Sequence, residues 1–557
     1  MAKIVRSLFS LENGKLRLMR RKIQNACVKH IHNECYAEVP QGRMKGRVCV
    51  APGGRKFYSF EGIPYAKPPV GRLGFQSPQK LEGWPGILDA TKPGNKCKQV
   101  HDVLKIIEGS EDCLYLNVYT PSLPKENVEK LPVLFLVHGG RLVDGFGAYY
   151  RPDYILSHDV ILVSINYRIN IFGFLCLHTP EVPGNAGLKD TAMALRWVRD
   201  NIGHFNGDSD NIVPIGESAG ASVVTSYLMS PMTRGLFSKV IAQSMNVFTD
   251  LFVTLHDPVE KASRIASIMR KNLTKPNDLF DFFSKASADD MIRAHTKIEY
   301  GRDMTDIHPF LIPVVEKQFD GVEPYLVEYP LQSVRNNRFD KVPVLMTMET
   351  HEGGIYVRKD ATGKAILNKE LRKFIPYFTG IDKDSERAFE IEKKLKKYYF
   401  GDKEIDQSQL EQYLNMFSDV YFMRDIIYGA ELLADHSDVY FLRFAYVGNM
   451  NTRVMKNLGI KGTSHGDILQ YLFYKDIKAK LCKEKDMEVI DTVTQMWSSF
   501  AKSGQPSWKN QNVKWLPYRK NSRYCLNIDE DGTKYMPLPE YERNKFVMDL
   551  LCERPLY

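Results

Sequence analysis

The segment "NIVPIGESAGAS", residues 211–222, joins a short β-branched run to the sequence Gly-Glu-Ser-Ala-Gly. This sequence fits the pattern G-x-S-x-G, in which a serine occupies a sharp turn between a strand and a helix. Gly216 and Gly220 flank Ser218 because the backbone is crowded at such a turn and a Cβ would collide with neighbouring segments. The run "ASVVTSYLM" that follows suits the helix. The segment therefore predicts a serine hydroxyl displayed above a sheet, at the amino end of a helix.

Other apolar runs along the chain resemble the one before Ser218. They are "LPVLFLVHGG", "DVILVSINYR", "KVIAQS", "VPVLMT" and "VYFLRFAY". Continuous runs of this length are typical of strands that are covered on both faces. Between them, "AGLKDTAMALRWVRDNIGHF" sets apolar side chains on one helix face, at residues 188, 192, 195, 198 and 202. Strands that alternate with helices predict an α/β fold with a mostly parallel central sheet, and ligands at the carboxyl ends of its strands.

The charge of the chain is concentrated at its beginning. The 557 residues carry a net charge of +9, and 43% of them are hydrophobic, enough for a large core. Residues 1–30 hold eight Lys and Arg residues against Glu12 alone, so the remainder is close to neutral. A nucleic-acid partner is therefore not expected. No apolar run approaches the roughly 18 residues of a transmembrane helix, and the nine scattered cysteines do not suggest a disulfide scaffold.

Residues 1–34 are predicted to be a basic amphipathic segment ahead of the globular part. Short apolar patches alternate with basic residues, which suits residues 1–30 to peripheral contact with an anionic membrane surface. The alternative is a solvated or docked helix. The patches are broken by "ENGK" and no clear cleavage site follows, so no signal peptide is predicted. The expected location is cytoplasmic, including the surfaces of intracellular membranes.

A serine at its ordinary pKa is a weak nucleophile, so Ser218 needs a base that is itself oriented by an acid. In folds with this turn, the acid and then a histidine follow the serine along the chain. His465, in "KGTSHGDILQYLF", lies in a loop before an apolar helix, where a base is displayed. The run "KVPVLMTMETHEGG" offers two acids, Glu349 and Glu352. Glu352 is the preferred candidate because it lies at the Gly-rich turn.

These residues lead to a known family. The chain resembles the type-B carboxylesterases, the esterase and lipase group that includes cholinesterases, and most closely the intracellular insect α-esterases. The matching segments follow one another in family order: "FEGIPYAKPPVGRL", "SEDCLYLNVYTP", "VHGG", "NYRINIFGFL", "GNAGLKDTAMALRWVRDNI", "GESAGAS", "SHGDILQYLF", "MWSSFAKSGQPSW" and "WLPY". The resemblance implies one α/β-hydrolase domain over residues 35–557.

The resemblance also implies the roles of single residues. Ser218 would attack an ester carbonyl, His465 would carry its proton to the leaving alcohol, and Glu352 would hold the imidazole. The oxyanion hole would consist of the backbone N–H groups of residues 140, 141 and 219, which are Gly140, Arg141 and Ala219.

Two further expectations follow from the family. Cys97 and Cys113 stand where its members have a disulfide, although a reducing cytosol disfavours such a bond. The implied partner is a small-molecule ester, dietary or xenobiotic, so a role in detoxification is expected. No cofactor and no metal are implied, and the sequence does not indicate the oligomeric state.

The chain departs from the family near the expected site. Arg141 and Leu142 replace the usual Gly and Phe, and Met245 replaces a usual Gly in "AQSMN". If residue 141 needs a positive φ, a side chain there costs about 1–2 kcal/mol. The guanidinium of Arg141 has three conceivable effects: it fills acyl or leaving-group space, it pairs with Glu217, or it attracts an anionic substrate. Because arginine stays protonated, it cannot act as a general base for organophosphate hydrolysis.

Three functions remain after these observations. The leading one is a serine carboxylesterase for small neutral esters, with activity narrowed or slowed by Arg141. The second is a slow protein of the same fold that sequesters hydrophobic esters or organophosphates. The third, which no sequence feature favours, is a non-enzymatic interaction module.

Overall fold

A computed structural model of the chain describes residues 34–124, 129–303 and 305–551. Its central feature is one sheet of thirteen strands, of which β4 (Ile87–Asp89) pairs with β2 at the side. The other twelve lie in the order β1 (Glu34–Val39), β2 (Gly42–Val50), β3 (Lys56–Pro64), β7 (Tyr115–Thr120), β9 (Ile161–Ile165), β8 (Leu131–Val137), β10 (Gly207–Glu217), β11 (Val240–Gln243), β12 (Val344–Glu349), β13 (Val439–Phe444), β14 (Tyr524–Asp529) and β15 (Gly532–Pro537). A separate pair is formed by β5 (Gln99–Val100) and β6 (Ile107–Glu108).

The centre of the sheet is parallel and its margins are antiparallel. All neighbours from β9 through β8, β10, β11, β12 and β13 to β14 run parallel to one another. From β1 through β2, β3 and β7 to β9, and from β14 to β15, neighbours pair antiparallel, while the side strand β4 pairs parallel with β2. Each of the apolar runs that predicted a strand forms one of these central strands. The prediction of an α/β fold with a mostly parallel sheet is therefore confirmed.

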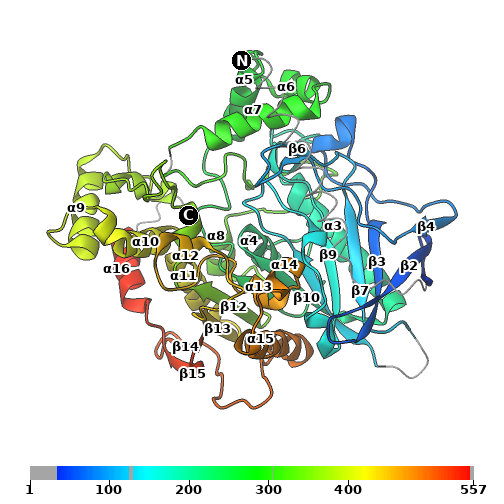
Figure 1. Cartoon of the computed structure of the whole chain (residues 1–557). Helices are drawn as coiled ribbons and strands as arrows, with labels where there is room; N and C mark the ends of the chain where they lie inside the picture. Colours follow the sequence, from blue (N-terminus) through cyan, green and yellow to red (C-terminus); the bar gives the residue numbers. More distant parts are fainter. Residues whose placement is uncertain (1–33, 125–128, 304, 552–557) are drawn as a thin grey trace, which may run out of the picture.

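Helices cover both faces of this sheet (Figure 1). They are α2 (Asn170–Phe174), α3 (Ala186–Asn201), α4 (Ala219–Ser226), α5 (Pro258–Ile268), α6 (Pro276–Phe283), α7 (Ala288–Tyr300), α8 (Pro330–Arg335), α9 (Glu386–Phe400), α10 (Leu410–Ser418), α11 (Arg424–Ala434), α12 (Val454–Leu458), α13 (Leu469–Leu472), α14 (Asp476–Ala479), α15 (Glu484–Ser503) and α16 (Tyr541–Leu551). The face predicted for the helix after residue 185 is buried in α3 and the turn that follows it.

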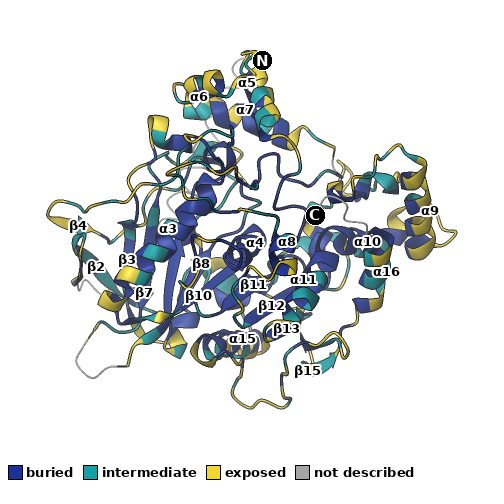
Figure 2. Cartoon of the chain, turned by 180° about the vertical axis from the view of Figure 1, so that it is seen from behind, coloured by how far each residue is buried: buried dark blue, intermediate teal, exposed yellow. Residues whose placement is uncertain are grey.

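The sequence of strand β8 is apolar without alternation because both faces of the strand are buried. Val133, Phe135 and Val137 belong to one core, which also contains the buried faces of α3, α4 and α11. Leu134 and Leu136 belong to a second core on the other side of the sheet, together with α13 and α15. Successive side chains of a strand point to opposite faces, so a strand between two cores must be apolar throughout. Figure 2 shows this burial in the central strands, with exposed residues gathered on α6 and α9.

The carboxyl ends of the parallel strands carry the predicted site. The chain leaves β8 into the loop that contains Arg141, β10 into Ser218, β12 into the 3-10 helix η5 (Glu352–Tyr356), and β13 toward the loop of His465. The predicted basic segment, residues 1–34, lies outside the described residues except for Glu34, the first residue of β1. Within the described part of the chain, no helix combines the length and the apolar character needed to cross a bilayer.

Candidate active site

Ser218 lies on the sharp turn between β10 and α4. Its φ of 57° and ψ of −131° are a strained combination for a residue with a side chain, of the kind that costs about 1–3 kcal/mol and gathers at functional sites. A Cβ on Gly216 would lie 2.2 Å from the carbonyl oxygen of Gly220, and a Cβ on Gly220 would lie 2.3 Å from that of Val137. The two glycines therefore let the turn pack against itself and against the end of β8, as the sequence predicted.

His465 and Glu352 form a close pair beside this turn. The imidazole Nδ1 of His465 lies 2.6 Å from Oε2 of Glu352, and both side chains are buried. Burial raises the pKa of Glu352 to about 7, although hydrogen bonds from Glu349 oppose the rise. The structure thus brings together the base and the acid that were chosen from 13 histidines and two glutamates.

Glu349, the other acid considered, lies behind Glu352 rather than on His465. Its backbone N–H donates to Oε1 of Glu352 at 2.8 Å, and the hydroxyl of Ser244 donates to its carboxyl. Glu349 is 0% exposed, and burial followed by the charge of Glu352 raises its pKa well above the usual range. Burial therefore favours the protonated form of Glu349, which lies behind Glu352. Sequence reasoning found the residue but not this role, and it missed Ser244.

The hydroxyl of Ser218 is not bonded to His465 in this structure. Its Oγ lies 3.9 Å from Sδ of Met245, while Nε2 of His465 is buried without a hydrogen bond and lies 3.3 Å from Oε1 of Glu217. Burial raises the pKa of Glu217 to about 6, with the charge of His465 acting in the opposite direction. Two carboxyl groups therefore lie against this imidazole, that of Glu352 at Nδ1 and that of Glu217 at Nε2. A rotation of the serine side chain is needed before the histidine can take its proton.

The loop after β8 supplies free backbone donors next to the serine. Gly140, Arg141 and Leu142 have φ values of 100°, 56° and 62°, all in the left-handed region. Within the described part of the chain, the N–H groups of residues 140, 141 and 219 donate to no protein acceptor. A Cβ on Gly139 would lie 3.1 Å from Cβ of Ser218, so this loop packs directly against the serine turn. Unpaired buried donors of this kind can stabilise an anionic oxygen.

The side chain of Arg141 turns away from Glu217. It forms an ion pair with Glu299 at the end of α7, and its Nη2 also lies 3.5 Å from the carbonyl oxygen of Ile307. The guanidinium carbon lies 5.9 Å from the centre of the Tyr356 ring. Of the effects considered for Arg141, pairing with Glu217 is therefore wrong, because Glu299 is the partner. Glu299 lies 158 residues further along the chain, and nothing in the sequence marks it.

Cys97 and Cys113 form a disulfide, as the resemblance implies. Both are buried, and their carbonyl and side-chain contacts hold the segment before β7. Within the described residues, no group of three or more His, Cys, Asp and Glu side chains has an arrangement that could hold a metal ion.

Comparisons with known proteins agree with this geometry. Residues 33–546 match the Carboxylesterase family. Esterase FE4 from Myzus persicae is 34% identical over 505 residues, which cover 87% of each chain, and a juvenile hormone esterase from Tribolium castaneum is 32% identical over 85% of this chain and 84% of its own. The structure of a juvenile hormone esterase from Manduca sexta with covalently attached OTFP superimposes with a TM-score of 0.81, at 26% identity, over 94% of this chain and all of that one. PNB esterase gives a TM-score of 0.75 at 26% identity, over 92% of this chain and all of its own.

The parallel sheet, the strained serine turn and the match along nearly the whole chain lead to one conclusion. This chain belongs to the carboxylesterase family, has the α/β-hydrolase fold, and is a carboxylic ester hydrolase.

Proposed function

We propose that the chain hydrolyses small neutral carboxylic esters, dietary and xenobiotic ones included, through an acyl-enzyme on Ser218. The observation that carries the proposal is the 2.6 Å pair of His465 and Glu352 beside a serine held on a strained turn. A nucleophile next to a base that an acid orients is the arrangement required for acyl transfer.

The reaction would begin with a rotation of the Ser218 hydroxyl from Met245 to Nε2 of His465. The serine oxygen then attacks the ester carbonyl while Nε2 takes its proton, and the imidazolium returns that proton to the leaving alcohol. Glu352 stabilises the imidazolium through Nδ1, and Glu217 adds a second negative charge 3.3 Å from Nε2. A water molecule, activated by the same imidazole, releases the acid and restores the serine.

The oxyanion of each tetrahedral intermediate would accept hydrogen bonds from the N–H groups of Gly140, Arg141 and Ala219. Their freedom from other acceptors supports this role. Arg141 keeps its N–H, so the replacement of glycine changes the strain of the loop and not the number of donors. One such donor is worth about 2.7–4 kcal/mol in the transition state.

The surroundings of Ser218 favour small, uncharged substrates. Met245, 7% exposed, touches the serine hydroxyl, and the ring of Phe422 lies 5.3 Å from the imidazole of His465. The carboxyl groups of Glu217 and Asp144 oppose an anionic substrate, and burial raises the pKa of Asp144 to about 7. We assign the narrowed acyl space to Met245 and to the Arg141 side chain beside Ile307.

The proposal includes the organisation of the chain. Residues 35–557 are taken as one catalytic domain, because a single sheet runs from β1 to β15. Residues 1–30 are taken as a basic arm for peripheral contact with an anionic membrane surface in the cytoplasm, on the strength of their composition.

A progress curve with p-nitrophenyl acetate and butyrate tests the proposal. Wild-type protein should turn over repeatedly, and Ser218→Ala should lose at least about 10³-fold in kcat, as expected when a triad member is removed. An alkylphosphonate should label wild-type protein at Ser218. Repeated turnover by Ser218→Ala, or labelling of another residue, would overturn the assignment.

A second candidate function is the sequestration of hydrophobic esters or organophosphates with little turnover. It is favoured by the resting contact between Ser218 and Met245 and by the positive φ of Arg141. Under this alternative, the progress curve shows a single burst of one equivalent and Arg141→Gly restores turnover. A non-enzymatic interaction module would show neither burst nor labelling.

A further inference from the structure

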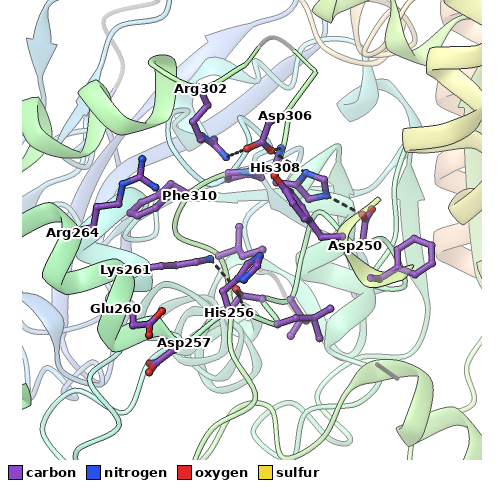
Figure 3. A pocket seen from close by; sticks show the side chains of 17 residues that line it. Asp250, His256, Asp257, Glu260, Lys261, Arg264, Arg302, Asp306, His308 and Phe310 are labelled. Atoms are coloured by element: carbon purple, nitrogen blue, oxygen red, sulfur yellow. Dashed lines mark hydrogen bonds and ion pairs between the residues drawn. The ribbon is translucent and has the colours of Figure 1, made fainter. Parts of the chain in front are cut away.

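A cavity of about 290 Å³ lies behind the proposed active site. Three parts of the chain line it: residues 250–264 with the start of α5, residue 302 and residues 306–312 after α7, and residues 377–378. None of the three proposed triad residues is among its lining residues. Segment 305–312 separates the two sites, since the carbonyl oxygen of Ile307 lies 3.5 Å from Nη2 of Arg141 while His308 and Phe310 face the cavity (Figure 3).

Three cationic side chains line this cavity, and of these Arg302 is paired with Glu299 and Asp306. Lys261 donates to the hydroxyl of Thr254 at 2.8 Å, and no carboxylate of the described residues lies within 4.0 Å of its ammonium group. The ammonium of Lys261 and the guanidinium of Arg264 lie 5.8 and 5.5 Å from the centre of the Phe310 ring. Nε of Arg302 is buried without a hydrogen-bond partner.

Burial and the nearby charge of Arg302 lower the pKa of Lys261 to about 8. A buried ammonium that lacks a counter-charge is destabilised, and an anion supplied from outside would remove this cost. Thr254 offers only a neutral hydroxyl. The position of Lys261 is therefore one that an anionic ligand would stabilise.

The acidic groups of the cavity are already engaged or lie in solvent. Asp306 contacts Arg302 and His308, and Asp250 lies 2.9 Å from the other ring nitrogen of His308. Asp257 caps α5 by accepting from the N–H of Val259, and both it and Glu260 are exposed at the rim. Exposed charges at the rim are screened by salt more strongly than the ammonium of the half-buried Lys261.

The remaining walls are apolar. Phe310, Val253, Ile312 and Phe378 are buried side chains that line the cavity. A volume of 290 Å³ is at the low end of ligand pockets, so the occupant is small. Apolar walls with a few convergent cations fit a ligand that has one anionic group on a short hydrocarbon or aromatic body.

We propose that this cavity is a binding site for a small apolar monocarboxylate, with the carboxylate held by Lys261 and Arg302 and the apolar body against Phe310. The acid product of ester hydrolysis belongs to this chemical class, as do free short-chain and aromatic acids. The site is separate from Ser218, so its occupancy does not depend on the proposed catalytic roles.

Calorimetric titration of the full chain with sodium benzoate at pH 7 tests this site, with benzamide as the uncharged probe of the same shape. Benzoate should bind with a Kd tighter than about 1 mM. Lys261→Met should weaken it at least tenfold, whereas the matched change Lys271→Met, at an exposed lysine beyond α5, should not. Val253→Trp should weaken it as much by filling the cavity while leaving Lys261 in place.

A measurement on the wild-type chain guards against misfolded variants. Reductive methylation followed by mass spectrometry should label Lys261 more slowly in saturating benzoate, with the rate at Lys271 unchanged. The proposal is overturned if benzoate does not bind, if benzamide binds equally well, if folded Lys261→Met and Val253→Trp both keep wild-type affinity, or if benzoate leaves the labelling of Lys261 unchanged.

Discussion

Met245 contacts the hydroxyl of Ser218 and takes up space next to it. Its sulfur lies 3.9 Å from the serine oxygen, and its side chain fills space where the family usually has none. Met245→Ala should raise kcat/KM for p-nitrophenyl hexanoate at least about tenfold relative to the acetate ester, because each methylene accommodated in a pocket is worth about 1–3 kcal/mol. Steady-state kinetics with the two esters measures this ratio.

The control for this substitution is Met496→Ala, a buried methionine of α15 in the core on the other side of the sheet. Both substitutions should lower the free energy of unfolding, by about 2–5 kcal/mol for a fully buried methionine. Only Met245→Ala should change the acyl preference. An unchanged ratio would show that the acyl chain does not lie along Met245.

Glu217 gives a prediction about pH. Its carboxylate lies 3.3 Å from Nε2 of His465 and also raises the pKa of Glu352. The charge of Glu217 holds the proton on Glu352 to higher pH, so Glu217→Gln should move the acidic limb of kcat/KM to lower pH. Full pH profiles of the variant and of Glu323→Gln, a surface glutamate paired with Arg196, measure this shift. If the acidic limb of kcat/KM does not move, it reports the titration of another group.

At the scale of elements, α7 holds the loop after β8, the proposed oxyanion loop. The side chain of Glu299, near the end of α7, is 1% exposed. It pairs with Arg141 and Arg302 and accepts from the N–H of Phe310 at 2.7 Å. One carboxylate therefore joins the loop after β8, the end of α7 and the segment that contains Phe310. Glu299→Gln removes the carboxylate partner of Arg141 and leaves Arg302 with Asp306 alone, and should cost on the order of 3 kcal/mol of unfolding free energy.

Arg141→Gly distinguishes the backbone strain at residue 141 from the contribution of the ion pair between Arg141 and Glu299. It relieves the positive φ, worth about 1–2 kcal/mol, while Glu299 keeps Arg302, so this variant should be close to wild type in stability. Urea unfolding of both single variants and the double variant should give a coupling of at least about 1 kcal/mol. If the changes in unfolding free energy of the two single variants add up to that of the double variant, the ion pair contributes nothing to stability. In activity, the freed guanidinium of Glu299→Gln should lower kcat/KM, and Arg141→Gly should restore it in that background.

Most of this framework could be predicted from the sequence, and the exceptions have a physical reason. The strands β8 to β13 were visible because a strand buried on both faces is apolar throughout, and the turn at Ser218 because only glycine fits at residues 216 and 220. The sequence carries no comparable signal for contacts between segments that are far apart along the chain. Glu299 meets Arg141 only because α7 folds back over the loop after β8, and Lys261 meets Arg302 for the same kind of reason. The opposite roles of Glu349 and Glu352 depend on burial that their spacing does not encode.

For the whole molecule, buried titratable groups make stability depend on pH. The pKa values of Glu352 and Asp144 are raised to about 7, that of Glu217 to about 6, and that of Glu349 well above its usual range, in each case mainly by burial. Such carboxyl groups hold protons in the native state at pH values where the unfolded chain has released them. Stability therefore falls as pH rises from the unfolded values, near 4, through the native ones.

Buried histidines act in the opposite direction at lower pH. Burial lowers the pKa values of His138, His295 and His351 to about 4, so between about pH 4 and 6.5 the unfolded chain binds more protons and stability rises with pH. The two groups oppose each other below pH 6.5. Above it, these three histidines are neutral in both states. The raised carboxyl groups still titrate there, and so does His308, whose pKa Asp250 and Asp306 raise against the effect of burial, so both make stability fall as pH rises.

The unfolding free energy of the wild-type chain should therefore be greatest near pH 6 and fall between about pH 6.5 and 8. Hydrolysis should rise over the same interval, because the proposed mechanism needs Glu352 charged beside His465. Urea unfolding at pH 6, 7 and 8 measures the first trend. Glu349→Gln, which keeps a donor behind Glu352 but cannot ionise, should flatten the decline in stability. A decline equally steep in Glu349→Gln would remove Glu349 as a source of the pH dependence, and stability that increases from pH 6.5 to 8 would contradict the raised pKa values as a group.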